Sequence, residues 1–170
     1  MTKTQSTFKL FFGLTILTLL FSSNAFSQDG KIVVTNKVLK QVIKKDKKGN
    51  ITYDYIEPGT ALPGDVMMYT ISFENISNEP VKGIVINDPV PNNSKYRINS
   101  ATGKNTKITF SIDGGKNYGS PDDLIVKDKS GKEWKAKPES YTHIRWDYTK
   151  TLEPGQKSEV FFKTQIKGNE

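Results

Sequence analysis

The segment ESYTHIRWDY (139–148) contains residue types from which a hydrolytic site could be built. It holds the only histidine of the chain, His143, and a Ser-His-Asp set needs a histidine as its base. In an extended strand, however, alternate side chains point to opposite faces. One face would carry Tyr141, His143, Arg145 and Asp147, and the other Thr142, Ile144, Trp146 and Tyr148. We therefore expect Trp146 to anchor a core and His143 to lie on a separate polar stripe, rather than a catalytic cluster.

A metal or cofactor site has little support in the sequence. Zinc sites use cysteine and histidine, and this chain has one histidine and no cysteine. Residues 113–123 (DGGKNYGSPDD) could supply oxygen ligands, but they lack the residue order and closing glutamate of a calcium loop. The candidate ligands are Asp113, Asn117, Asp122 and Asp123. A β-turn followed by an ordinary loop is favoured, with a bound cation as the alternative, and we expect no cofactor.

Asp88 precedes a proline at the end of a candidate strand. An aspartate in that position commonly accepts hydrogen bonds from backbone N–H groups, so we expect a capping role. The paired carboxylates of a glycoside hydrolase could still come together from distant strands. A hydrolase is therefore the least favoured functional hypothesis.

Two aromatic residues lie among basic residues, as in surfaces that bind glycans or nucleic acids. They are Tyr96 in SKYRIN (94–99) and Trp134 in GKEWKAK (131–137). The alternative is that each packs inward from a short strand, because strands favour aromatic residues. Tyr96 and Trp134 are the predicted partner surface, if the protein has one.

The arrangement of apolar residues indicates strands throughout the chain after its first 30 residues. Apolar and polar residues alternate in 66–75, 107–113, 142–148 and 159–167, and no sustained helical period occurs. Further strands are expected at 31–43 (continuous or interrupted near Asn36), 51–56, 81–87, 95–99, 124–127 and 132–136. Many short strands separated by turn residues predict an all-β, antiparallel β-sandwich. A closed barrel is less favoured because the loops are unequal in length and rich in proline.

Turn residues indicate where the strands are joined. KKDKKGN (44–50) contains Asp46 and the Gly49–Asn50 pair, so we expect a lysine-rich hairpin tip rather than an anion site. ALPGD (61–65) and LEPGQ (152–156) each place Pro-Gly before an alternating strand. We interpret this as the same turn chemistry used twice, not as a duplicated domain.

The first 27 residues have the layout of a secretory signal peptide. Lys3 and Lys9 precede an apolar run at 10–21, and small residues allow cleavage after Ala25 or Ser27, of which we favour Ser27. An uncleaved anchor is the alternative, although the run is short for a bilayer. We expect a signal peptide at 1–27, a single domain at 28–170 and export to the periplasm or beyond. No later apolar run reaches membrane length, so we expect no membrane span after cleavage.

The composition further limits the kinds of exported protein that this chain can be. The net charge of +7 becomes +5 without the two lysines of the signal segment. Such a surface is compatible with anionic partners. The absence of cysteine excludes a lipoprotein anchor and a disulfide-stapled scaffold.

The run PGDVMMYTISFENISNEPVKGIVINDPVP (63–91) resembles the conserved-repeat domain of bacterial envelope and surface proteins, known as domain-of-unknown-function family eleven. The matching positions are Pro63, Gly64, Tyr69, Asn75, Ile84, Ile86, Asp88, Pro89 and Pro91. Residues 108–119, 141–148 and 152–166 are similar to its later strands. The resemblance implies an immunoglobulin-like sandwich with no established enzymatic chemistry or cofactor. Family members often carry many copies, whereas this sequence shows one and no sorting tail, which puts a stalk role in doubt.

The sequence leaves three functional hypotheses. The first is a non-catalytic exported envelope protein whose Ig-like module serves surface structure, adhesion or assembly. The second is a small module that binds glycans or polyanions through Tyr96 and Trp134, and the third is a hydrolase. Envelope proteins or anionic glycans are the expected partners, and nucleic acid is not expected.

Overall fold

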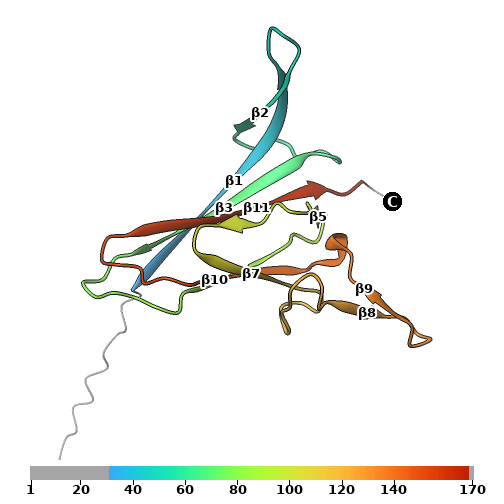
Figure 1. Ribbon diagram of the computed structural model, residues 1–170. Coiled ribbons are helices and arrows are strands. Elements are labelled where there is room, and N and C mark those ends of the chain that lie inside the picture. The colour runs from blue at the N-terminus through green and yellow to red at the C-terminus, as the bar shows by residue number, and fades with distance from the viewer. Residues whose placement is uncertain (1–30, 169–170) are drawn as a thin grey trace, which may run out of the picture.

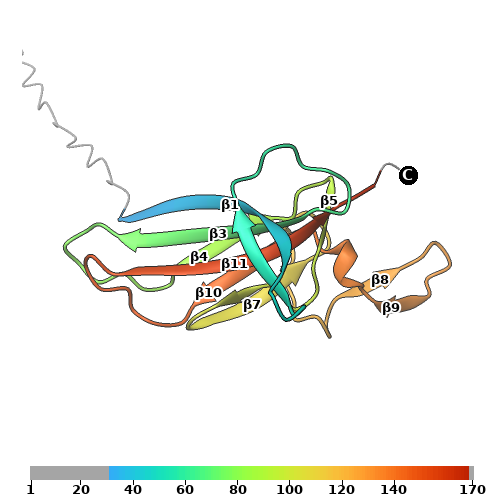
Figure 2. The same ribbon diagram turned by 90° about the horizontal axis from the view of Figure 1, so that it is seen from above.

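The computed structural model describes residues 31–168, so the signal-peptide prediction lies outside the described residues. Apart from strands, the described residues contain one other regular element, the 3-10 turn η1 (Pro138–Ser140), and turns and loops join the elements. Two antiparallel sheets face each other across a common core (Figures 1 and 2). The predicted all-β, antiparallel sandwich architecture is confirmed.

The larger sheet has the strand order β2-β1-β3-β11-β5, and the short β6 also pairs with β11. In the register, Ile71 of β3 lies between Asn36 of β1 and Val160 of β11. The strands are β1 (Ile32–Lys45), β2 (Ile51–Ile56), β3 (Val66–Asn75), β5 (Ser94–Tyr96), β6 (Thr102–Gly103) and β11 (Lys157–Ile166). The inner face of this sheet is apolar because β3 and β11 alternate in phase.

The smaller sheet has the order β4-β10-β7. Its strands are β4 (Val85–Pro89), β7 (Thr106–Ser111) and β10 (His143–Tyr148). Trp146 of β10 lies between Ile86 and Ile108, and residues directly opposite one another share a face. All three side chains therefore point toward the larger sheet.

Trp146 lies at the centre of the core. Its side chain is fully buried, and its ring centroid is 5.9 Å from that of Phe162 on the opposing sheet. Phe162 stacks on Tyr69 at 4.9 Å, and Phe73 meets Tyr148 edge-on at 5.5 Å. These contacts join β3 and β11 to β10, so aromatic side chains and the buried aliphatic residues of the core together hold the two sheets in contact.

Most predicted strands are confirmed, but the segment 95–99 is strand only as far as Tyr96. The segment 31–43 forms part of one continuous strand, without a break at Asn36. The segment 81–87 becomes a strand only at Val85, because Val81 instead forms an isolated bridge to Leu152. The two-residue β6 is too short for alternation to reveal.

The two Pro-Gly turns are built alike, as predicted. Gly64 and Gly155 have φ values of +88° and +73°, which glycine adopts at little cost. In each turn an N–H bonds back to the carbonyl three residues earlier, from Asp65 to Leu62 and from Gln156 to Glu153. This geometry is that of a type II turn.

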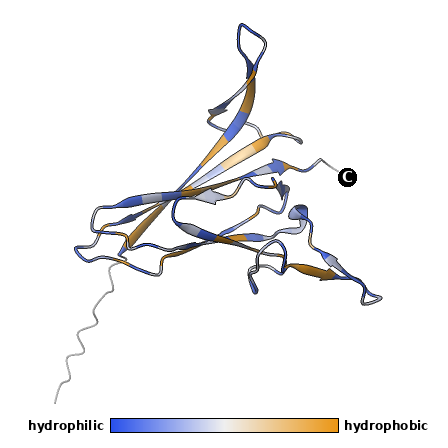
Figure 3. Ribbon diagram, viewed as in Figure 1, coloured by the Kyte–Doolittle hydropathy of each residue, from blue (hydrophilic) through white to orange (hydrophobic). Residues whose placement is uncertain are grey.

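Two hairpins project from the sandwich (Figure 1). The first, which we call the arm, is formed by residues 40–56 of β1 and β2, and its tip is the predicted lysine-rich turn. There the Asp46 carboxylate accepts hydrogen bonds from the N–H groups of Lys48 and Asn50. The second hairpin consists of β8 (Ile125–Lys127) and β9 (Glu133–Lys135). Figure 3 shows hydrophobic residues on the arm as well as along the central strands.

Truncation of Trp146 tests the central packing. We expect Trp146→Ala to lower the free energy of unfolding by about 3–5 kcal/mol, since it opens a large cavity. Trp146→Phe should cost much less, because the buried indole N–H has no hydrogen-bond partner in the described part of the chain. Urea denaturation measures both variants. Trp134→Ala is the control and should change stability by less than about 0.5 kcal/mol; equal losses for the two Trp146 variants would contradict this account.

Candidate functional site

The residues of segment 139–148 divide between the two faces of β10, as predicted, with one exception. Ile144, Trp146 and Tyr148 are buried, whereas His143 and Arg145 are partly exposed. The prediction that Tyr141 lies on the polar face is wrong, because it is only 5% exposed. Tyr141 follows η1 and precedes the strand, so strand alternation does not set its direction. Its ring stacks on Phe110 at 4.6 Å.

His143 is not joined to a carboxylate within residues 31–168. Its Nδ1 lies 3.2 Å from the hydroxyl of Thr142. The neighbouring Arg145 donates from Nε to Asn87 at 2.8 Å and lies 3.8 Å over the ring of Tyr118. The polar stripe of β10 is therefore organised around Arg145, and no Ser-His-Asp geometry is assembled around His143.

The four candidate cation ligands in 113–123 do not converge. Asp113 accepts hydrogen bonds from Ser111 and from the backbone and side chain of Asn117. These bonds hold the pKa of the Asp113 carboxyl well below its usual range, the Asn117 N–H being the largest cause. Asp122 pairs with Lys135 at 2.6 Å, and Asp123 accepts from Ser120. Within the described residues no three His, Cys, Asp or Glu side chains are grouped for a metal.

Asp88 does not cap backbone N–H groups, contrary to expectation. It lies directly opposite Ile144, so its side chain points inward, and it accepts no hydrogen bond from the described residues. It lines a recess of about 270 Å³ with Tyr69 and Pro91. Burial raises the pKa of Asp88 to about 6. Burial also raises the pKa of Tyr69, with a smaller contribution from the Asp88 charge.

The two residues of the predicted partner surface lie in different environments. Tyr96 is only 5% exposed, so the prediction that it is a surface residue is wrong. It belongs to β5, which pairs with β11, and its ring packs against Phe110 and Tyr141. Trp134 is 43% exposed on β9 and is available to a partner. The structure therefore does not bring the two side chains together on one surface.

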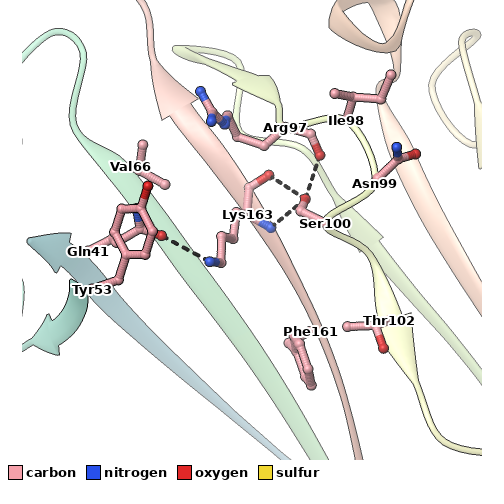
Figure 4. A pocket seen from close by; sticks show the side chains of 10 residues that line it. All are labelled: Gln41, Tyr53, Val66, Arg97, Ile98, Asn99, Ser100, Thr102, Phe161 and Lys163. Atoms are coloured by element: carbon pink, nitrogen blue, oxygen red, sulfur yellow. Dashed lines mark hydrogen bonds between the residues drawn. The ribbon is translucent and has the colours of Figure 1, made fainter. Parts of the chain in front are cut away.

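A larger candidate site lies on the outer face of the larger sheet. It is a groove of about 400 Å³ between the arm and the loop that follows β5. Figure 4 shows the side chains that line it: Gln41, Tyr53, Val66, Arg97, Ile98, Asn99, Ser100, Thr102, Phe161 and Lys163. They come from five separate segments of the chain, so strand pairing creates this groove.

Lys163 connects the walls of the groove. Its ammonium donates to Gln41 at 2.9 Å and to the Tyr55 hydroxyl at 2.7 Å, and so fastens β11 to the arm. On the other side, the Ser100 hydroxyl accepts a hydrogen bond from the Lys163 N–H at 3.0 Å and donates to the Arg97 carbonyl. The loop 97–100 is thus held against β11.

The chemistry of the groove suits an anion better than a cation. Arg97 and Lys163 supply two positive charges, and no Asp or Glu is among the lining residues. Tyr53 is 58% exposed and Phe161 partly exposed, so both can offer ring faces to a ligand. Sequence reasoning missed this site. The only indication of it in the sequence was the alternation of 159–167, which places Phe161 and Lys163 on the solvent-facing side of their strand.

Comparisons with family models, with curated proteins and with solved structures found no match to this chain. In residues 31–168, no helix has the length and apolar character needed to cross a membrane.

The inward-facing Asp88 predicts an unusual dependence of stability on pH. Because its pKa is higher in the folded than in the unfolded chain, the folded protein binds more protons between about pH 4 and 6. Its carboxyl therefore costs stability as the pH rises through that window. We expect Asp88→Asn to raise the free energy of unfolding at pH 7 by about 1–2 kcal/mol, a value reduced for partial solvation.

Urea denaturation at pH 4 and pH 7 measures this effect, and the gain should largely disappear at pH 4. Asp113→Asn is the matched control with the opposite sign. The lowered pKa of Asp113 stabilises the fold above about pH 4, so this variant should be less stable at pH 7. A loss of stability in Asp88→Asn at pH 7 would show that the carboxylate makes favourable contacts.

Proposed function

We propose that this chain is a non-catalytic, exported module of a bacterial envelope, with an immunoglobulin-like sandwich that acts in adhesion or assembly. Its ligand-binding surface is the groove between the arm and loop 97–100. The sequence resemblance and the signal-like first 27 residues support the location, and the two-sheet architecture is consistent with the fold. The groove supports a binding role.

One observation carries the proposal: two cationic and two aromatic side chains share one open groove without a carboxylate. Sugar rings pack on aromatic faces, and carboxylated sugars add ion pairs to Arg97 and Lys163. Ile98, 67% exposed at the rim, adds apolar surface. An anionic envelope polysaccharide therefore fits this groove better than a neutral or cationic ligand.

The placement of the titratable groups favours binding over catalysis. His143 belongs to the smaller sheet, Asp88 points inward, and Asp113 is engaged by its own turn. General acid–base chemistry requires a titratable side chain within hydrogen-bond reach of the substrate. The groove offers positive charges and amides, which hold an anion, and no carboxylate or histidine lines it.

Charge reversal at Arg97 tests the proposal. The probe is alginate, a soluble polyuronate, with neutral dextran for comparison, and binding is measured by titration calorimetry at low salt. We expect alginate to bind and dextran not to bind. Arg97→Glu should weaken binding at least tenfold, because it places a carboxylate in the groove, and added salt should also weaken binding.

Lys107→Glu is the matched control, since Lys107 is exposed on β7 of the other sheet and the variant has the same net charge. Its affinity should stay within about twofold of the parent. Equal losses in the two variants would indicate nonspecific attraction to a basic protein. Absence of alginate binding by the parent would argue against the anionic-glycan ligand.

A second candidate surface is the β8–β9 hairpin. Trp134 is exposed there and is flanked by Lys135, while Lys129 and Lys132 lie in the adjoining turn. Trp134→Ala would abolish glycan retention if this hairpin were the site. We expect it to change alginate affinity by less than about twofold, because the groove supplies the main contacts. A tenfold loss in that titration would move the site to the hairpin.

A further inference from the structure

The arm ends the larger sheet with an uncovered strand. Within the described chain β2 pairs only with β1, so its other edge is free. The arm also exposes several apolar side chains. Ile43, Ile51 and Tyr53 are 67%, 59% and 58% exposed and share the outer face of the arm. A free edge beside exposed apolar side chains is a template for pairing with another strand.

The register identifies which groups of β2 face that edge. Asp46 donates its N–H to the Asn50 carbonyl, and antiparallel pairs alternate between bonded and non-bonded positions. Thr52 and Asp54 therefore bond toward β1, and the intervening residues present their N–H and C=O groups outward. The outward-facing residues are Ile51, Tyr53 and Tyr55. The β1–β3 pair follows the same alternation. Just past the end of that ladder, the Ile76 N–H donates to the Lys31 carbonyl.

We propose that the free edge of β2 pairs with β2 of a second copy of this chain, antiparallel and centred on Tyr53. In this register Tyr53 faces Tyr53 of the second copy, and Ile51 faces Tyr55. Every outward-facing residue then meets another outward-facing residue. The Tyr55 N–H, which bonds to the Asp54 carboxylate at 2.9 Å, exchanges that partner for the Ile51 carbonyl of the second copy on pairing. A shift of one residue in either direction would place outward groups against groups already bonded to β1. The strand is therefore complementary to itself.

Side chains and charges favour the same register. Ile43, Tyr53 and their counterparts form one apolar row across four strands, as cross-strand pairs on a common face do. At each end of the paired strands, the lysine-rich turn of one copy approaches Glu57 of the other copy, where the loop after β2 begins. Lys48 lies opposite Pro58, and Glu57 opposite Gly49. A parallel arrangement would instead place the two lysine-rich tips side by side.

The pairing is isologous and closes as a dimer, with the two larger sheets joined into one. Tyr53 lines the groove, so the dimer axis brings the two grooves next to each other. Two linked grooves would bind a repeating polymer with greater avidity than one. The inference rests on the edge of β2 and does not depend on what the groove binds.

Cysteine cross-linking tests the register directly, because the chain has no cysteine of its own. In the proposed dimer the two Tyr53 Cα atoms lie about 5.5 Å apart, within disulfide range. Tyr53→Cys in the purified chain should therefore give a covalent dimer on mild oxidation. Ile51→Cys is the matched control: the two positions would be more than about 13 Å apart, so little dimer should form. Equal linking at both positions, or none at Tyr53→Cys, would overturn the proposal.

Sedimentation without cross-links provides the second test. We expect the parent to dimerise and Tyr53→Phe to resemble it. Tyr53→Pro should weaken dimerisation at least tenfold, because it removes an outward N–H and leaves the β1 ladder intact. Lys48→Glu and Glu57→Lys should each weaken the dimer, and the double variant should recover it. A parent that is monomeric at 100 μM (~10²-fold above a micromolar Kd) would refute the dimer. Alginate binding by such a monomer would leave the proposed function intact.

Discussion

The contact between Trp146 and Phe162 fixes the positions of the other functional side chains. The two residues come from interior strands of opposing sheets, β10 and β11, and both are fully buried. Once they face each other, every neighbour along β10 and β11 has its direction assigned by alternation. Arg145 must point outward on one sheet and Lys163 on the other. The polar stripe and the groove are thus consequences of where two aromatic rings pack.

Alternation predicted the sheet faces well because it is a local property. It assigned Trp146 and Phe162 to the core and Lys163 to the solvent from a few residues of sequence. It failed for Tyr141, which lies beside a turn. For Tyr96 the inward-packing alternative is confirmed, whereas the surface prediction relied on the neighbouring basic residues. The direction of Tyr96 depends on pairing with β11 and on its hydroxyl oxygen, which accepts a hydrogen bond from Ala101. No local pattern carries such information.

The groove could not be predicted for a related reason. Gln41, Arg97 and Lys163 are far apart in sequence, and they meet because β1, β3 and β11 pair in one particular register. A shift of one residue would move Lys163 to the buried face. Asp88 shows the converse. Its position before a proline suggested a cap, but its pairing with Ile144 turns the side chain inward. Strand register, more than residue type, determines which polar groups are available.

The free edge of the arm is open to pairing with any exposed strand. Several features restrict nonspecific pairing: the tip carries Lys47 and Lys48, and the Tyr55 N–H is already occupied by the Asp54 carboxylate at 2.9 Å. Lysines repel strands of like charge, and an occupied N–H shortens the usable edge. The groups that remain open are the N–H and C=O of Ile51 and Tyr53 and the C=O of Tyr55. The short open edge has lysines at one end and Glu57 at the other. It therefore disfavours most strands, but it suits an antiparallel strand with the same charges, because each lysine end then meets a glutamate end. The features that keep the arm from aggregating therefore also favour a second copy of the chain as its partner.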